Sequence, residues 1–257
     1  MIRLGTLVGE LGEMPGTHTD EAVVHLLDRA RHLIGASDSL IAFGMRSATW
    51  PPDDPLLGWR STPAVRRGPN AARDAQLLDA WYHSRPNLPL DHGLVTLACT
   101  PHAFAARQAQ IAARAPHAQA AVEELFDACG IGDRILAAVP VTGHAKLLFG
   151  AYRRRGSDPF SEGDAALVEA LMAAIVGPAR RMALAYGVIE ADRPLTPRER
   201  DVLRLLLQGL TEKESACELG LATRSLHHHV SALYAKYGVR SRAELLALFL
   251  GTRRAPR

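Results

Sequence analysis

The run His227-His228-His229 places three imidazoles next to one another in the sequence. Imidazole can bind a metal ion, carry a proton or hydrogen bond to a nucleic-acid base. In a helix, however, successive side chains point about 100° apart, so these three histidines cannot face one ion. We therefore expect neither a metal nor a cofactor here, and hydrogen bonding is the chemistry that remains.

A helix expected over about residues 223–237 has two different faces. The stripe to be buried consists of Leu226, Val230, Leu233 and Tyr237. The opposite face carries Arg224, His228, Ser231 and Ala235, with His227 at its margin. A face of cations, imidazoles, hydroxyls and small residues, without glutamate, suits phosphates and base edges in a DNA groove.

Capping signals divide the chain around this helix into four short helices. A hydroxyl is followed three residues later by a glutamate at Thr196/Glu199, Thr211/Glu214 and Ser241/Glu244, which is the capping-box pattern. Gly209, Gly220 and Gly238 stand just past the first three helices, where a left-handed residue is favoured. The pattern predicts a compact unit of four helices.

Residues 195–250 resemble the LuxR/FixJ-type helix-turn-helix, the DNA-binding module of many bacterial transcription regulators. The resemblance is carried by LTPRE at 195–199, Gly-Leu-Thr at 209–211, Leu-Gly-Leu at 219–221, His-Val at 229–230, Lys236, Gly-Val at 238–239 and Arg-Ala-Glu at 242–244. It implies that the third helix lies in the major groove of double-stranded DNA. It directs His227, His228 and Ser231 toward bases, and Thr211, Lys213, Ser225 and Lys236 toward the DNA backbone. Thr223 and Arg224, at the start of the same helix, complete the expected DNA-binding set.

Three positions depart from the family pattern. Ser215 replaces a usual isoleucine in the second helix. Ala222 stands where Ser or Thr normally caps the recognition helix, so we expect capping to move to Thr223. His227 and His228 occupy positions often held by other residues, so the operator sequence cannot be inferred from relatives.

Positive charge is concentrated in the same region. Residues 195–257 contain 11 Lys/Arg and 6 Asp/Glu, a net charge of +5, whereas the other residues sum to −2 and the whole chain to +3. This distribution is expected of a nucleic-acid module. The alternative is a helical bundle whose arginines are merely solvated.

The preceding residues predict an α+β domain with an antiparallel sheet. We expect a helix at about 20–34, a strand at 39–45, an irregular excursion at 47–70 and helices near 73–83 and 102–128. A hairpin follows over 134–141 and 145–153, and then a long helix that is capped by Ser161 and kinked at Gly177-Pro178.

The end of this domain resembles a GAF domain over residues 133–187. The resemblance rests on Val-Pro-Val at 139–141, Gly150, Pro-Phe-Ser at 159–161 and Asp164. It implies a GAF-like sensory or dimerising domain over 18–187, a linker at 188–194 and the helix-turn-helix domain at 195–257. Such a domain can bind a small molecule, but its fold does not specify which one.

Other function classes lack their sequence signatures. No nucleophile-elbow, zincin, dinucleotide or phosphate-loop motif is present, so we expect no enzyme. Three widely separated cysteines favour a reducing, cytoplasmic compartment. We expect no signal peptide, because Glu10 and Glu13 lie in the N-terminal stretch, and no membrane span, because Glu169 interrupts the apolar run 165–176.

The last helix suggests a homodimer, because the run Leu245–Leu250 is apolar on every side. Leu245 and Phe249 can pack on the unit's own core, which leaves Leu246, Leu248 and Leu250 for a second surface. That surface is either a second copy or the N-terminal domain of the same chain. Two other functions remain open: a module that docks on RNA polymerase, and a dimeric regulator that needs no ligand.

Overall fold

The computed structural model describes residues 4–54, 56–83, 92–114 and 119–251. It has a mixed α and antiparallel β part followed by helices, which confirms the predicted α+β fold class. The chain divides into two compact units. The first consists of residues up to Gly12 together with Val23–Gly177, and the second of Glu13–Ala22 together with the chain from Pro178 onward.

This division differs from the predicted domain boundaries. The predicted linker, 188–194, lies inside the second unit, where Val188 and Ile189 are buried. The amide of Asp192 donates to the carbonyl oxygen of Lys236 at 2.9 Å. The segment is therefore packed against the C-terminal helices, because its apolar residues and backbone polar groups find partners there.

One antiparallel sheet organises the first unit. Its strands are β1 (Asp38–Arg46), β2 (Trp59–Ser61), β3 (Val65–Arg67), β4 (Phe104–Arg107), β5 (Ile131–Thr142) and β6 (Ala145–Arg154). The order is β2-β1-β6-β5-β4, and β3 also pairs with β1. The hairpin β5–β6 is where the sequence predicted it. The predicted irregular excursion contains β2 and β3, and β4 replaces the start of the predicted helix 102–128.

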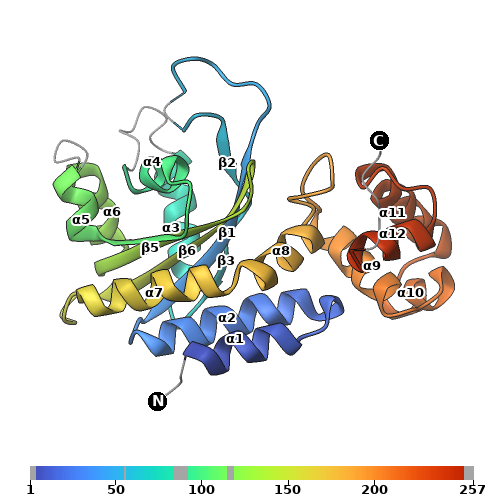
Figure 1. The fold of residues 1–257 in the computed structure, drawn as a ribbon, viewed down its shortest axis with the longest axis horizontal. Helices are drawn as coiled ribbons and strands as arrows, with labels where there is room; N and C mark the ends of the chain where they lie inside the picture. Colours follow the sequence, from blue (N-terminus) through green and yellow to red (C-terminus); the bar gives the residue numbers. More distant parts are fainter. Residues whose placement is uncertain (1–3, 55, 84–91, 115–118, 252–257) are drawn as a thin grey trace. The chain divides into compact units, whose positions relative to one another are not determined.

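Helices cover both faces of the sheet (Figure 1). They are α1 (Leu4–Glu13), α2 (Thr19–Leu33), α3 (Ala71–His83), α4 (His92–Cys99), α5 (Gln108–Arg114), α6 (Gln119–Cys129) and α7 (Glu162–Ala174). The 3₁₀ turn η1 (Gly16–His18), between α1 and α2 in the sequence, belongs to the second unit. The hydroxyl of Ser39 on β1 donates to Leu27 on α2, and Lys146 on β6 donates to the carbonyl oxygens of Leu97 and Ala98 on α4. Because side chains alternate along a strand, Ser39 and Lys146 mark opposite faces of the sheet.

A cavity lies on the face of the sheet that α4 covers. Its volume is about 880 Å³. Leu40, Leu136 and Leu148 line it from three strands, and Ala75 and Phe126 line it from α3 and α6. The cavity is therefore roofed by helices and floored by alternate residues of the sheet.

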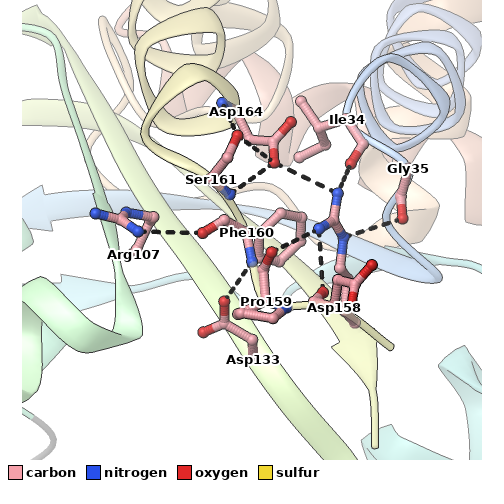
Figure 2. A network of polar contacts seen from close by, with 10 residues as sticks. Ile34, Gly35, Arg107, Asp133, Asp158, Pro159, Phe160, Ser161 and Asp164 are labelled. Atoms are coloured by element: carbon pink, nitrogen blue, oxygen red, sulfur yellow. Dashed lines mark hydrogen bonds and ion pairs between the residues drawn. The ribbon is translucent and has the colours of Figure 1, made fainter. Parts of the chain in front are cut away.

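The loop between β6 and α7 is held by Arg153 and its surroundings (Figure 2). The guanidinium donates to the carbonyl oxygens of Ile34, Asp158 and Pro159, and it stacks on the ring of Phe160 at 4.2 Å. Ser161 caps the start of α7, as predicted, and Asp164 forms a capping box with it. These contacts fix where α7 begins relative to β6 and α2.

The predicted kink is present: α7 ends at Ala174, and α8 (Val176–Ala185) begins just before Gly177-Pro178. Among the described residues, no helix combines the length and apolarity needed to cross a membrane.

Candidate nucleic-acid interface

The four predicted C-terminal helices are α9 (Pro197–Leu207), α10 (Glu212–Glu218), α11 (Thr223–Lys236) and α12 (Arg242–Phe249). They share one apolar core with the segment before them. The core residues of α11 are Leu226, Val230 and Leu233, followed by Tyr237, which is the predicted stripe. Burying this stripe turns the other side of α11 to solvent.

The predicted caps set the helix ends. Complete capping boxes are present at Thr196/Glu199 and Thr211/Glu214. Ser241 accepts from the amide of Glu244, but the Glu244 carboxylate accepts from the amide of Arg240, so the third box is only half formed. The glycines at 209, 220 and 238 have φ values of 98°, 62° and 59°, as expected for helix stops.

The solvent-facing side of α11 carries the predicted polar residues. Thr223, Arg224, Ser225, His227, His228 and Ser231 are all exposed. Ala235 is exposed on the same helix, and small residues allow close approach to a groove. The arrangement offers one guanidinium, two imidazoles and three hydroxyls from a single helix.

The neighbouring helix α10 adds both a cation and a carboxylate. Lys213 is exposed, whereas the hydroxyl of Thr211 is bonded to Glu214, within its own cap. Glu212 lies 3.1 Å from Nδ1 of His227. Sequence reasoning missed this contact, because it joins residues fifteen positions apart across the turn between α10 and α11. It leaves Nε2 as the ring nitrogen of His227 that can face a partner.

Lys236 is not part of this exposed face. Its side chain is 6% exposed, and its ammonium lies 2.6 Å from the Glu199 carboxylate and 3.1 Å from the carbonyl oxygen of Pro194. This placement argues against the predicted phosphate contact, because the ammonium faces the core and is already paired. Position 236 lies three residues after buried Leu233, so helical spacing already placed it beside the stripe.

The ion pair also holds Glu199 in its charged form. Burial alone would raise the pKa of this carboxyl group, but hydrogen bonds from Lys236 and Thr196 outweigh burial and lower the pKa. Glu199 thereby caps α9 and anchors the end of α11. Lys236 and Glu199 thus join the two helices.

Two departures from the family pattern have structural consequences. Ser215 is fully buried, and its hydroxyl has no hydrogen-bond partner among the described residues. Ala222 is the N-cap of α11 and makes no side-chain hydrogen bond, so capping does not move to Thr223 as predicted. The recognition helix therefore begins without a side-chain cap.

The burial of the apolar residues of α12 agrees only partly with the prediction. Leu245 is buried, and Phe249 packs edge-on against Tyr237 with ring centroids 5.9 Å apart. Leu248 is buried in the core, contrary to the prediction that it would need a second surface, whereas Leu250 is 75% exposed. The uncovered apolar surface is thus smaller than the sequence indicated.

Comparison with known proteins identifies this group of helices. Residues 193–249 match the family model described as "Bacterial regulatory proteins, luxR family". The chain is 40% identical over 57 residues to the probable HTH-type transcriptional regulator GfsR of Streptomyces halstedii, which is 22% of this chain and 24% of that protein. It is 48% identical over 52 residues to the transcriptional regulatory protein UhpA of Escherichia coli, which is 20% of this chain and 26% of that protein.

Solved structures extend the likeness to the whole fold. A crystal structure of Escherichia coli SdiA matches with a TM-score of 0.50 and 14% identity, over 97% of each chain. A structure of SdiA in complex with octanoyl-rac-glycerol matches equally well, with a TM-score of 0.50 and 13% identity, over 97% of this chain and 93% of that chain. At such low identity the likeness shows the fold alone.

The C-terminal unit therefore contains a LuxR-family helix-turn-helix domain. The chain spans only about a quarter of the length of relatives such as GfsR and UhpA. The matched segment is that domain.

Proposed function

We propose that the protein is a DNA-binding transcriptional regulator and that α11 enters the major groove. One observation carries the proposal: the exposed side of α11 presents Arg224, His228 and Ser231 without a carboxylate of its own, while the other side is buried. The LuxR-family match of this segment supports it. A helix with this face can reach base edges and phosphates together.

The residues divide by the chemistry they offer. His227, His228 and Ser231 are proposed to contact bases, because imidazole and hydroxyl groups can donate to or accept from base edges. Arg224, Thr223 and Ser225 lie in the first turn of α11 and are proposed for the phosphates beside the groove, as is Lys213 on α10. Thr211 is proposed to contact the backbone through its main chain, because its hydroxyl is engaged in the cap.

The remaining proposals concern the whole protein. We infer that it acts as a homodimer in the cytoplasm and not as an enzyme, and that the first unit regulates DNA binding through a small molecule in its cavity. The size of that cavity supports the last point, since ligand sites typically measure about 300–1,000 Å³. The SdiA complex shows a lipid-like ligand bound to a protein of similar fold.

The first experiment is selection of bound genomic fragments by the purified full-length protein, followed by competition among the selected sites. We expect His228→Ala to reduce the preference for the best site, because a lost base contact typically costs about 1–3 kcal/mol. His32→Ala, which changes an exposed histidine of the first unit, is the matched control and should leave the preference unchanged.

An unaltered ranking of sites by His228→Ala would remove His228 from the proposed base contacts. Failure to select any DNA, with binding to RNA polymerase instead, would overturn the proposed function and favour a docking module.

A further inference from the structure

A carboxylate lies beside the proposed base-reading residues, on the helix next to α11. Glu212 is the first residue of α10, and its Oε2 lies 3.1 Å from Nδ1 of His227. Since phosphates repel carboxylates, Glu212 on its own would only weaken DNA binding. Its contact with His227 indicates a second role.

The two side chains of this pair are covered to different extents. The His227 side chain is 65% exposed, whereas the Glu212 side chain is 37% exposed. The ring therefore remains accessible to a partner while it contacts the carboxylate. An ion pair as exposed as this one contributes little to folding stability, so stabilisation of the domain does not explain it.

The charge of Glu212 also acts further along α11. Burial raises the pKa of the Tyr234 hydroxyl, and the negative charge of Glu212 raises it further. Tyr234 follows His227 by seven residues, and residues with this spacing share one side of a helix. Glu212 therefore lies beside the side of α11 that carries both residues.

The carboxylate determines which nitrogen of the ring carries a proton. An ionised carboxylate only accepts hydrogen bonds, so Nδ1 of His227 donates to Glu212. Nε2 then accepts a hydrogen bond when the ring is neutral and donates one when the ring is charged. The contact excludes a neutral ring that donates from Nε2, and it holds the ring in one orientation.

The pair also separates specificity from affinity. Binding to DNA of any sequence depends on the number of phosphates that cations neutralise. Glu212 offsets the positive charge that the His227 ring carries when it is protonated, so the pair adds little attraction to phosphates. The pair adds a hydrogen bond of fixed direction instead, and the strength of that bond depends on the base edge opposite it.

We propose that Glu212 is a positioning residue for sequence recognition, which orients the His227 ring so that Nε2 reads one base pair in the major groove. The same carboxylate lowers the affinity for DNA of any sequence. The inference rests on the proposed function of α11 and specifies how one of its residues discriminates. In the competing arrangement Glu212 contacts DNA itself, since a glutamate can accept from the amino group of cytosine.

Discrimination is measured with the full-length protein on its best selected site and on copies of that site with each base pair of a half-site replaced in turn. The ratio of the two affinities gives the discrimination at each base pair. We expect His227→Ala to lower the ratio at one base pair about fivefold or more, because a lost base contact contributes about that factor. Glu212→Ala should lower the same ratio about threefold or more, because it removes the hydrogen bond that holds the ring.

Glu212→Ala should change binding to unrelated DNA in the opposite direction. The affinity should rise, and the gain should shrink at high salt, because the substitution removes a negative charge beside the phosphates. Glu212→Gln keeps an oxygen that can accept from Nδ1, so it should retain more of the ratio than Glu212→Ala while it also raises affinity. Glu218→Ala removes another exposed glutamate, at the far end of α10, and is the control that should leave every ratio unchanged.

A double variant tests whether the glutamate acts through the ring. Glu212→Ala combined with His227→Ala should discriminate as His227→Ala does, because Glu212 has no ring to position once His227 is replaced. A further loss of discrimination in the double variant would show that Glu212 contacts DNA itself, and it would overturn the proposal.

The remaining outcomes separate the inference from the proposed function. If Glu212→Ala raises the affinity for all DNAs equally and leaves the ratios unchanged, Glu212 only repels DNA, so the positioning role is wrong and the proposed function stands. The positioning role is also wrong if Glu212→Gln discriminates no better than Glu212→Ala. If the wild-type protein selects no DNA, the proposed function fails and the inference fails with it.

Discussion

Lys213 and Lys236 belong to the same small domain, yet their side chains have opposite environments. Lys213 is exposed on α10, and Lys236 is buried against Glu199 at the end of α11. The family resemblance directed both toward the DNA backbone. Helical spacing separates them, because Lys236 follows Leu233 and precedes Tyr237 on the buried stripe. The position of Lys236 on its helix, next to the buried stripe, therefore explains its burial.

Lys236→Met and Lys213→Ala should therefore change different measurements. We expect Lys236→Met to reduce the free energy of unfolding by about 3–5 kcal/mol, because it leaves the Glu199 carboxylate buried and unpaired. We expect Lys213→Ala to leave stability unchanged and to flatten the dependence of log K on log salt concentration by about 1. Urea denaturation and salt-dependent DNA titration provide the two readouts.

A matched double variant tests the cause. Glu199→Leu combined with Lys236→Met removes both charges and should recover part of the lost stability. The assignment of Lys236 to the core would be wrong if Lys236→Met kept the wild-type stability and flattened the salt dependence.

Ser215 is a second polar residue that is buried in the core. Its buried hydroxyl lacks a partner among the described residues, and an unsatisfied buried polar group costs about 1–3 kcal/mol. Ser215→Ala should therefore raise the free energy of unfolding by about 1 kcal/mol or more in urea denaturation. Ser231→Ala changes an exposed serine in a helix, so it measures the contribution of helix propensity alone. Equal gains from the two variants would mean that the Ser215 hydroxyl is satisfied in solution.

The elements that depend on residues close together in the sequence were predicted best. The β5–β6 hairpin, the Ser161 cap of α7 and the interruption at Gly177-Pro178 depend on neighbouring residues, and they lie where the sequence placed them. Strands β2, β3 and β4 have three or four residues each, and they exist because they pair with β1 or β5. The alanine-rich stretch around β4 favours a helix locally, but pairing with β5 overrides that preference.

Helix α11 begins without the side-chain cap that usually marks the start of a helix. Its N-cap, Ala222, has the extended backbone of a capping residue, φ −66° and ψ 141°, but no hydroxyl to accept from the first amides. We expect Ala222→Ser to add about 1 kcal/mol to the free energy of unfolding, measured in urea, without altering the ranking of DNA sites.

Ala235→Ser is the control for this substitution. It introduces the same side chain at an exposed position within α11, where a serine slightly disfavours the helix. If Ala222→Ser stabilised the protein no more than Ala235→Ser, the amides at the start of α11 would already be satisfied.

On the scale of the whole molecule, the end of the last helix is the candidate contact between two copies of the chain. Leu246 is half-buried and Leu250 is 75% exposed, so α12, the last helix of the LuxR-family domain, ends in apolar surface. The sequence overestimated this surface, because Leu248 turns into the core through packing that helix periodicity alone did not fix. A self-complementary patch of this kind suits a two-fold dimer.

We therefore expect full-length protein to dimerise on DNA that carries two half-sites about one helical turn apart. Leu250→Glu should weaken binding to that DNA and reduce its cooperativity, because it places a charge in the proposed apolar contact, while binding to a single half-site stays unchanged. Leu57→Glu changes another exposed leucine, in the first unit, and should affect neither DNA. Sedimentation equilibrium with each DNA gives the number of bound copies. One bound copy on the two-half-site DNA, or equal binding by Leu250→Glu and the wild type, would show that α12 is not the dimer contact.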